Sequence, residues 1–412
     1  MSNNLVEIHA CEVCGNTDLM KVLDLGYHPM CDDLIKIGDS RISQEYPIEI
    51  LLCQDCLTAH QRFQIPKREL FPPTYHYRAR FTSDVLDGMA ALVELCKDRF
   101  GDLEGKKVLD IGCNDGSLLD YFKKKGAVTL GIEPTDAQEE AEHKGHKTYK
   151  AFFDANIADR IIDTHGKLDF VVFTNVFAHI ENLPEVIYSL RALTDTNTII
   201  VIENHYLGAV LDRNQFDTFY HEHPRTYSYT SFVRIARLLG LCILSVEFPK
   251  RYGGNIRVFM GNKTNGLYNS QAHDLLDMER NISKKFDILA QRVDQWKLNK
   301  SKVIDQLVVK HGRLRAKAFP GRAAILIKLL GLTGNTISAV YEKPGSLKIG
   351  FYVPGTRIPI LSDDFLFQAP SDSQPLLNLA WHIPGEIRRY LSEKGYRGPV
   401  IDIVDANDFG AK

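Results

Sequence analysis

The feature that most constrains the fold of this chain is an apolar strand that runs into a turn with two glycines. Residues 108–111 form the end of the strand, and Gly112 and Gly116 follow just before a predicted helix. Glycines at such positions let the backbone pass close to a ligand. The next predicted strand ends in Glu133, 23 residues after Asp110. This order of strand, turn, helix, strand and acid predicts a nucleotide-binding half of a doubly wound α/β sheet.

The spacing within this turn indicates which cofactor it holds. Asp-x-Gly-x-x-x-Gly differs from the dinucleotide pattern Gly-x-Gly-x-x-Gly and favours S-adenosylmethionine over NAD. Glu133 would accept both hydroxyls of a ribose, and Phe153 with Asp154 would flank the adenine, although phenylalanines here also suit a core. A tight turn without a ligand is the alternative. The predicted cofactor-binding residues are Asp110, Gly112, Asn114, Gly116, Glu133, Phe153, Asp154 and Asn175.

Apolar strands alternate with helical segments through the middle of the chain, which predicts a largely parallel sheet covered by helices. A helix is expected over residues 81–100, before the first strand. Gly253 and Gly254 suit a tight turn that closes an antiparallel pair at the end of this region. The predicted strands span residues 107–111, 128–133, 170–174, 198–203, 242–248 and 255–260.

Four of the eight cysteines form two Cys-x-x-Cys pairs, Cys11 with Cys14 and Cys53 with Cys56. Four thiolates complete the tetrahedral shell of Zn²⁺ and leave no open position, so the pattern predicts a structural zinc site and not a catalytic one. Disulfide pairing is the alternative, and a reducing compartment makes it the weaker one. Apolar runs beside each pair, residues 19–25 and 46–52, indicate a small β-rich domain.

The C-terminal third predicts a second, smaller α/β domain behind a long helical segment over residues 270–314, in one helix or two. A further helix is expected over residues 385–394. The predicted strands span residues 323–327, 337–341, 358–361, 376–379 and 400–404. The domain boundaries that follow are 1–70 for the zinc-binding part, 71–268 for the cofactor-binding part and 269–412 for the last part.

Two histidines and a carboxylate lie together in Tyr220-His221-Glu222-His223, in a predicted loop beyond the strand that ends at residue 203. Ligands of α/β folds bind at loops that follow parallel strands. A histidine can take a proton, a tyrosine can stabilise an oxyanion, and a glutamate can orient an imidazole. His179 follows another strand and should face the same pocket. A solvated polar loop is the alternative for the cluster, and a core or capping role is the alternative for His179.

The overall composition argues against several partners. The formal net charge is -2, which gives no field that would gather nucleic acid or an anionic membrane surface. No apolar run reaches the roughly 18 residues of a membrane span, and the N-terminus lacks a signal-peptide pattern. These observations predict a cytoplasmic protein with a small-molecule substrate. The sequence does not define an oligomeric state.

The motifs resemble those of the sugar C-methyltransferase family, whose members methylate C3 of nucleotide-linked 4-keto-deoxysugars with S-adenosylmethionine. Tyr-His-Glu-His followed by Gly-Gly-x-x-Arg-Val is a highly specific combination. The resemblance spans nearly the whole chain and includes the paired cysteines, Tyr75-His76-Tyr77, residues 110–116, Asn175-Val176-Phe177-Ala178-His179, residues 217–223 and Gly253-Gly254-Asn255-Ile256-Arg257-Val258.

The resemblance implies a zinc-binding head, a central class I methyltransferase domain with a Rossmann-like fold, and a C-terminal Rossmann-like domain that helps to hold the nucleotide-sugar. It implies that His223 is the base that removes the C3 proton. Tyr220 and Glu222 resemble its neighbours in the family pocket, and His179 with Tyr75 or Tyr77 would lie near the sugar. Residues 352–360 and 379–382 also match family segments.

Two stretches depart from the family pattern. Residues 318–323 read Ala-Phe-Pro-Gly-Arg-Ala where relatives carry Gly-Ala-x-x-Lys-Gly, and residues 29–34 replace a less polar stretch. These changes bear on substrate identity more than on reaction type. The expected reaction is therefore methyl transfer to C3 of a nucleotide-linked 4-keto-deoxysugar through an enolate. O-methylation of a sugar or another small molecule, and a non-catalytic binding role in a carbohydrate pathway, are the alternatives.

Overall fold

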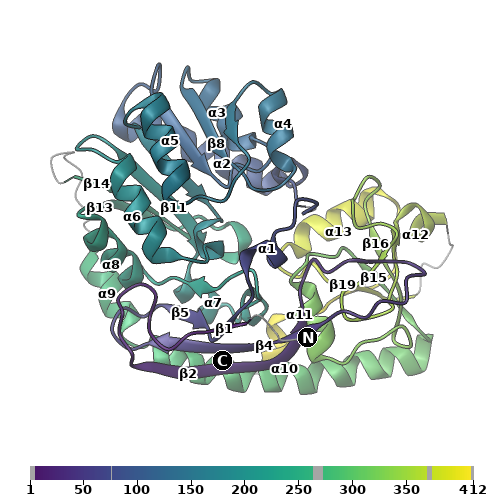
Figure 1. The fold of residues 1–412 in the computed structure, drawn as a ribbon. Helices are drawn as coiled ribbons and strands as arrows, with labels where there is room; N and C mark the ends of the chain where they lie inside the picture. Colours follow the sequence, from purple (N-terminus) through teal and green to yellow (C-terminus); the bar gives the residue numbers. More distant parts are fainter. Residues whose placement is uncertain (1–4, 76, 263–271, 369–373, 410–412) are drawn as a thin grey trace. The chain divides into compact units, whose positions relative to one another are not determined.

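The computed structural model describes residues 5–75, 77–262, 272–368 and 374–409, so His76 of the tyrosine motif lies outside the described residues. The chain forms two compact units (Figure 1). The first unit contains residues 1–21, 50–213 and 222–283, and the second contains residues 22–49, 214–221 and 284–412. Each unit has its own parallel sheet. Among the described helices, none is both long enough and apolar enough for a membrane crossing.

A seven-stranded sheet forms the centre of the first unit, in the order β13-β14-β11-β10-β7-β8-β9. All neighbouring strands are parallel except those that pair with β14, which runs antiparallel to both β11 and β13. The predicted antiparallel pair is therefore confirmed. The strands are β7 (Lys107–Ile111), β8 (Val128–Ile132), β9 (Lys147–Tyr149), β10 (Phe170–Thr174), β11 (Ile199–His205), β13 (Cys242–Glu247) and β14 (Asn255–Gly261).

Helices cover both faces of this sheet because its strands are apolar on both sides. Val171 and Phe173 of β10 belong to a core shared with α5, α6 and α8, whereas Phe170 and Val172 belong to a core shared with α2 and α3. Such continuous apolar strands are typical of doubly wound sheets. The helices are α2 (Ser83–Phe100), α3 (Ser117–Lys123), α4 (Ala137–His143), α5 (Ala155–His165), α6 (Leu183–Leu193), α7 (Leu207–Asp212), α8 (Tyr229–Leu239) and α9 (Ala272–Glu279).

The N-terminal part is rich in β-strands, as the sequence predicts. β1 (Val6–Glu7) pairs with β6 (Phe63–Gln64). A four-stranded sheet has the order β12-β5-β4-β2. Its strands are β12 (Arg225–Thr226), β5 (Ala59–Gln61), β4 (Glu45–Cys53) and β2 (Leu19–Pro29), and a short helix, α1 (Lys67–Leu70), follows. β12 comes from far along the chain, so this sheet is not built from the N-terminal residues alone.

The second unit contains a five-stranded parallel sheet in the order β18-β16-β15-β19-β20, the strand order of a Rossmann-like half. Its strands are β15 (Leu314–Lys317), β16 (Ile337–Glu342), β18 (Ile360–Ser362), β19 (Leu376–Asn378) and β20 (Val400–Asp402). A separate pair joins β17 (Phe351–Tyr352) and β3 (Ile35–Lys36). The helices are α10 (Ile282–His311), α11 (Ala323–Leu329), α12 (Asp364–Gln368) and α13 (Pro384–Glu393).

One predicted strand of this unit is wrong. Residues 323–327 lie in the helix α11, and the strand that starts the sheet is β15, which the sequence analysis did not predict. A short helix whose residues are all buried shows no amphipathic period and looks like a buried strand. The long helical segment is two helices, α9 and α10, and the helix predicted over residues 385–394 is confirmed as α13.

Candidate functional site

The glycine turn lies at the carboxyl end of β7, between the first two strands of the nucleotide-binding half. Gly112 has a φ of 76°, and a Cβ at this position would lie 2.5 Å from Val176. Gly116 also has a φ of 76° and directly precedes α3. Only glycine adopts both conformations without strain or collision. The turn therefore keeps its backbone close to the edge of the sheet, as the sequence predicts.

Glu133 lies directly after β8 and is buried, with its carboxylate turned back to the glycine turn. Its Oε2 accepts a hydrogen bond from the Asn114 N–H at 3.0 Å. Its Oε1 accepts hydrogen bonds from the N–H and the hydroxyl of Thr135, at 3.0 and 2.6 Å. A carboxylate has about four acceptor sites, so it keeps the capacity to accept a further hydroxyl. This geometry suits the ribose role predicted for Glu133.

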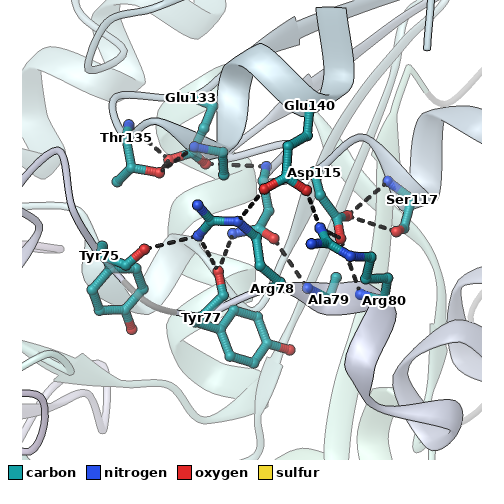
Figure 2. A network of polar contacts seen from close by, with 12 residues as sticks. Tyr75, Tyr77, Arg78, Ala79, Arg80, Asp115, Ser117, Glu133, Thr135 and Glu140 are labelled. Carbon is teal, nitrogen blue, oxygen red and sulfur yellow. Dashed lines mark hydrogen bonds and ion pairs between the residues drawn. The ribbon is translucent and has the colours of Figure 1, made fainter. Parts of the chain in front are cut away.

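Residues 77–80 lie against the glycine turn (Figure 2). The Asn114 side chain accepts a hydrogen bond from the Ala79 N–H at 3.0 Å and donates one to the Tyr77 carbonyl at 3.2 Å. Arg78 donates to Glu140 of α4 at 2.7 Å, and Arg80 pairs with the same carboxylate. The sequence analysis did not predict this contact between the tyrosine motif and the cofactor turn.

Asp110, at the end of β7, is fully buried beside the turn. Burial raises its pKa to about 8, and the nearby Glu133 carboxylate acts in the same direction. Its neighbour in the turn, Asp115, instead accepts hydrogen bonds from the N–H and hydroxyl of Ser117 at the start of α3. The two aspartates therefore differ: Asp115 accepts hydrogen bonds from the first residue of α3, whereas burial favours the protonated form of Asp110 near neutral pH.

Three imidazole rings, His179, His205 and His223, form what we call the histidine cluster. The ring centroids of His179 and His223 are 4.8 Å apart and nearly perpendicular, and those of His205 and His223 are 5.3 Å apart. Burial lowers the pKa of His179 to about 4, so this ring is neutral at physiological pH. His205 ends β11 and was missed by the sequence analysis, although its place at the carboxyl end of a parallel strand could have indicated it.

The other predicted catalytic residues are divided between the two units. Glu222 accepts a hydrogen bond from the Tyr75 hydroxyl at 2.9 Å, so these two predicted residues are brought together within the first unit. Tyr77 contributes its carbonyl to the glycine turn, and its side chain is 41% exposed. Tyr220 belongs to the second unit, with residues 214–221. Its role beside His223 stays a prediction.

The remaining predicted cofactor residues have clear local partners. Asp154 caps α5, because its carboxylate accepts a hydrogen bond from the Ile157 N–H at 3.0 Å. Phe153 packs against the apolar core on the α5 face of the sheet. Asn175 has a φ of 56°, and its side-chain carbonyl accepts a hydrogen bond from Asn255 at 3.1 Å. Their predicted contacts with the cofactor stay predictions.

A buried charge network that the sequence analysis missed holds the sheet beneath the histidine cluster. Glu203 of β11 pairs with Arg251 at 2.5 Å and with Arg257 of β14 at 2.7 Å. Burial alone would raise the pKa of Glu203, but the two guanidinium groups lower it. Asn255 donates a hydrogen bond both to Glu203 and to Asn175. The network therefore links β11 and β14 to the loop that carries His179.

The four paired cysteines converge as a metal site requires. Cys11 Sγ lies 3.4 Å from Cys56 Sγ, Cys14 Sγ lies 3.5 Å from Cys53 Sγ, and all four sulfurs lie within 4.8 Å of one another. Zn–S bonds of about 2.3 Å in a tetrahedron place sulfurs about 3.8 Å apart. The cysteines are free, which argues against the disulfide alternative. This donor set fits a structural zinc ion.

The fold and the site together define an S-adenosylmethionine-dependent methyltransferase, and family models match three successive parts of the chain. Residues 11–71 match a model described as "Putative zinc binding domain", residues 77–246 match "Methyltransferase domain", and residues 250–400 match "C-methyltransferase C-terminal domain". The predicted cofactor and the predicted structural zinc are consistent with these matches and with the cysteine cluster.

Among known proteins, the chain is 27% identical to the C-methyltransferase NovU of Streptomyces niveus over 92% of this chain and 91% of that protein. It is 32% identical to the ubiquinone biosynthesis O-methyltransferase of Rhodopseudomonas palustris, but only over 27% of this chain and 42% of that protein. The three successive model matches and the likeness to NovU along nearly the whole chain support an S-adenosylmethionine-dependent C-methyltransferase.

Two solved methyltransferase structures each match less than half of the chain. One is a magnesium protoporphyrin IX methyltransferase from Synechocystis with bound S-adenosylmethionine, with 15% identity, a TM-score of 0.33, and coverage of 44% of this chain and 80% of that one. Another is a methyltransferase from Archaeoglobus fulgidus, with 15% identity, a TM-score of 0.35, and coverage of 42% and 93%. The strand order described above carries the fold assignment.

Proposed function

We propose that this protein methylates carbon 3 of a nucleotide-linked 4-keto-deoxysugar, with His223 as the base. The observation that carries the proposal is the histidine cluster at the carboxyl edge of the sheet that holds the glycine turn. The likeness to the C-methyltransferase NovU along nearly the whole chain supports carbon as the acceptor. The nucleotide-sugar substrate and the C3 position come from the family resemblance of the motifs.

The base must be neutral before it takes a proton, and its surroundings favour this state. His223 is 5% exposed, and its neighbour His179 has a pKa lowered to about 4 by burial. Burial disfavours the charged form of an imidazole. A carbonyl next to the reacting carbon lets the departing proton leave an enolate behind. Positioned proton transfer typically contributes a factor of ~10²–10⁴ to the rate.

Other residues of the site would bind and orient the substrate. The Tyr75 hydroxyl donates a hydrogen bond to the carboxylate of Glu222, which directly precedes His223 in the sequence. We assign both side chains a role in binding the sugar. Tyr220 and Tyr77 are proposed to complete this contact. A hydrogen-bond donor to the enolate oxygen would lower the activation barrier by about 2.7–4 kcal/mol. When bound at Glu133 and the glycine turn, S-adenosylmethionine supplies a methyl group activated by its sulfonium.

The proposal is tested by incubating the full chain with methyl-labelled S-adenosylmethionine and a panel of nucleotide-linked 4-keto-deoxysugars. We expect label on C3, and His223→Asn should lower kcat by at least ~10²-fold, because a positioned base contributes this factor. Cofactor affinity, measured by calorimetry, should change less than about twofold, since the predicted ribose contact is made by Glu133.

One control separates carbon from oxygen as the acceptor. With S-adenosylhomocysteine in place of the methyl donor, the enzyme should still exchange the C3 hydrogen of the keto-sugar with deuterium from solvent, because enolate formation precedes transfer. The partial likeness to ubiquinone biosynthesis O-methyltransferases makes this control necessary. Label on a hydroxyl oxygen without any C3 exchange would contradict the proposal.

A further inference from the structure

The chain directly after His223 is a strand of the sheet that carries the cysteine site. Arg225 and Thr226 of β12 pair antiparallel with His60 and Ala59 of β5. The Gln61 N–H donates a hydrogen bond to the Pro224 carbonyl at 2.8 Å. The histidine is therefore followed at once by three residues whose backbone is fixed to the zinc-binding part of the first unit.

A buried ion pair joins the same strand to the first Cys-x-x-Cys pair. Arg225 is 0% exposed, and its Nη1 lies 2.5 Å from Glu12 Oε2. Glu12 stands between Cys11 and Cys14 in the sequence. The Glu12 carboxylate is therefore held by Arg225, and its position in the chain is set by the cysteines on either side of it.

His60 and Gln64 complete the surroundings of this ion pair. The Gln64 side chain donates a hydrogen bond to Glu12 Oε2 at 2.8 Å. One ring nitrogen of the fully buried His60 lies 3.5 Å from the same oxygen, and the other lies 3.3 Å from Cys11 Sγ. Removing one member of a buried pair leaves the other charge uncompensated. Loss of either Glu12 or Arg225 should therefore disturb the other side chain of the pair.

The second Cys-x-x-Cys pair holds the other end of this segment. The carbonyl of Cys56 accepts hydrogen bonds from the hydroxyls of Ser228 at 3.3 Å and Ser231 at 3.2 Å. Ser228 is the N-cap of α8, and Thr58 donates a further hydrogen bond to Ser231 at 2.8 Å. Both cysteine pairs thus contact the segment of residues 224–231, one at each end.

We infer that the four-cysteine site positions His223 through the segment of residues 224–231 that follows it. Glu12 and Arg225 are then positioning residues that act through His223. A structural zinc ion orders the short turns that bind it. Here those turns carry Glu12 and the Cys56 carbonyl, which fix the chain after His223. A displacement of about 1 Å at a reacting group can cost ~10²-fold in rate. The inference rests on the proposed function in taking His223 as the base.

The second Cys-x-x-Cys pair supplies a matched control. Asp55 stands inside that pair as Glu12 stands inside the first. Its side chain is 55% exposed, and its ion-pair partner Arg234 lies 3.8 Å away and is 40% exposed. Asp55→Ala therefore removes an acid that is likewise adjacent to a cysteine, without removing a contact to residues 224–231.

The test compares Glu12→Ala with Asp55→Ala in the zinc-loaded full chain. Zinc content and the dissociation constant of S-adenosylmethionine are measured for both variants. We expect one zinc per chain and cofactor affinity within about twofold of the parent in each. Glu12→Ala should lower kcat at least ~10-fold, with a smaller change in KM, and Asp55→Ala should leave both within about twofold. Glu12→Gln, which keeps a hydrogen-bonding oxygen, should restore part of the loss.

A second measurement does not depend on turnover. In protein labelled with ¹⁵N-histidine, the His223 resonance is identified by its loss in His223→Asn. It should move or broaden in Glu12→Ala and stay unchanged in Asp55→Ala. If no keto-sugar is methylated, the proposed function fails, and this resonance still decides the positioning role.

Some outcomes would overturn the inference. If Glu12→Ala loses its zinc, Glu12→Gln and Arg225→Lys take its place, since both keep a polar group at the contact. Metal-loaded variants with parent-like kcat and an unmoved His223 resonance would mean that β12 only packs against the cysteine site.

Discussion

A single residue, Asp110, illustrates how burial can prepare a group for its ligand. It lies at the carboxyl end of β7, and burial together with the Glu133 charge raises its pKa to about 8. The carboxyl group is then mostly protonated at pH 7 in the cofactor-free protein. An opposite charge nearby favours the ionised form. S-adenosylmethionine carries such charges on its sulfonium and its ammonium group, so binding at the glycine turn should be coupled to the loss of a proton.

We therefore expect cofactor binding to release most of one proton near pH 7, and affinity to rise as the pH approaches 8. Calorimetry in buffers with different ionisation enthalpies measures the released proton directly. Asp110→Asn should abolish the buffer dependence, whereas the exposed Asp102→Asn should not. A binding enthalpy that is the same in all buffers for the parent protein would argue against the coupling.

At the scale of elements, the Glu203 network joins two strands and a helix. Besides its ion pairs with Glu203, Arg251 donates a hydrogen bond to the Val85 carbonyl, and Arg257 donates one to the Gly88 carbonyl, both on α2. Gly88 is required there, because a Cβ would lie 2.5 Å from the Arg251 guanidinium. The Glu203 carboxylate thus joins β11 to β14, and its two arginine partners join these strands to α2.

Glu203→Ala should destabilise the protein by about 3–5 kcal/mol, because it leaves two buried guanidinium groups without their counter-charge. Urea unfolding followed by circular dichroism measures the change. Glu203→Gln should cost less, since its amide oxygen still accepts hydrogen bonds. A Glu203→Ala variant as stable as the parent would show that water or neighbouring groups compensate the arginines.

The features that were predicted correctly have a local sequence pattern, and the elements that were missed lack one. The glycine turn, Glu133 and the paired cysteines are local patterns, so they were readable without a structure. α11 was taken for a strand because Ala323 to Ile327 are all buried, which removes the helical period. β15 was missed because Arg315 and Lys317 are charged yet buried, and Lys317 is paired with Asp363 at 2.7 Å.

Contacts between distant segments account for what could not be predicted in the site. The pairs Glu12–Arg225 and Glu203–Arg251 join residues far apart in the chain, and no local spacing encodes them. His205 was outside the predicted strand, which ended at residue 203, so its approach to His223 was not foreseen. Local patterns therefore named the cofactor turn and the metal ligands, but not the groups that position them.

At the scale of the whole molecule, the two compact units do not follow the order of the chain. The second unit takes residues 22–49 and 214–221 in addition to the C-terminal part, so His221 and His223 belong to different units. The division into domains at residues 70 and 268 stays a prediction. The motif Tyr-His-Glu-His is one segment in sequence, but Tyr220 and His221 belong to the second unit and Glu222 and His223 to the first.

Buried histidines in both units should make the protein sensitive to mild acid. Burial lowers the pKa to about 4 for His28 and His221 of the second unit and for His179 of the first. Unfolding restores the ordinary value of 6.5. Between these values the unfolded chain binds protons that the native chain does not, so stability falls as the pH drops from 6.5 towards 4. The loss is at most about 1.4 kcal/mol per pH unit for each group.

Two of these three histidines, His28 and His221, lie in the second unit. Each donates one hydrogen bond to a nearby backbone carbonyl, His28 to Leu25 at 2.8 Å and His221 to Tyr46 at 3.2 Å. Because a carbonyl can only accept, the ring nitrogen is the donor, and glutamine can take its place without a titrating group. His28→Gln should therefore flatten the dependence of the unfolding free energy on pH between about 6.5 and 4, whereas His273→Gln, at an exposed position, should leave it unchanged. Urea unfolding at several pH values measures these slopes, and equal slopes for the parent and His28→Gln would assign the acid sensitivity to other groups.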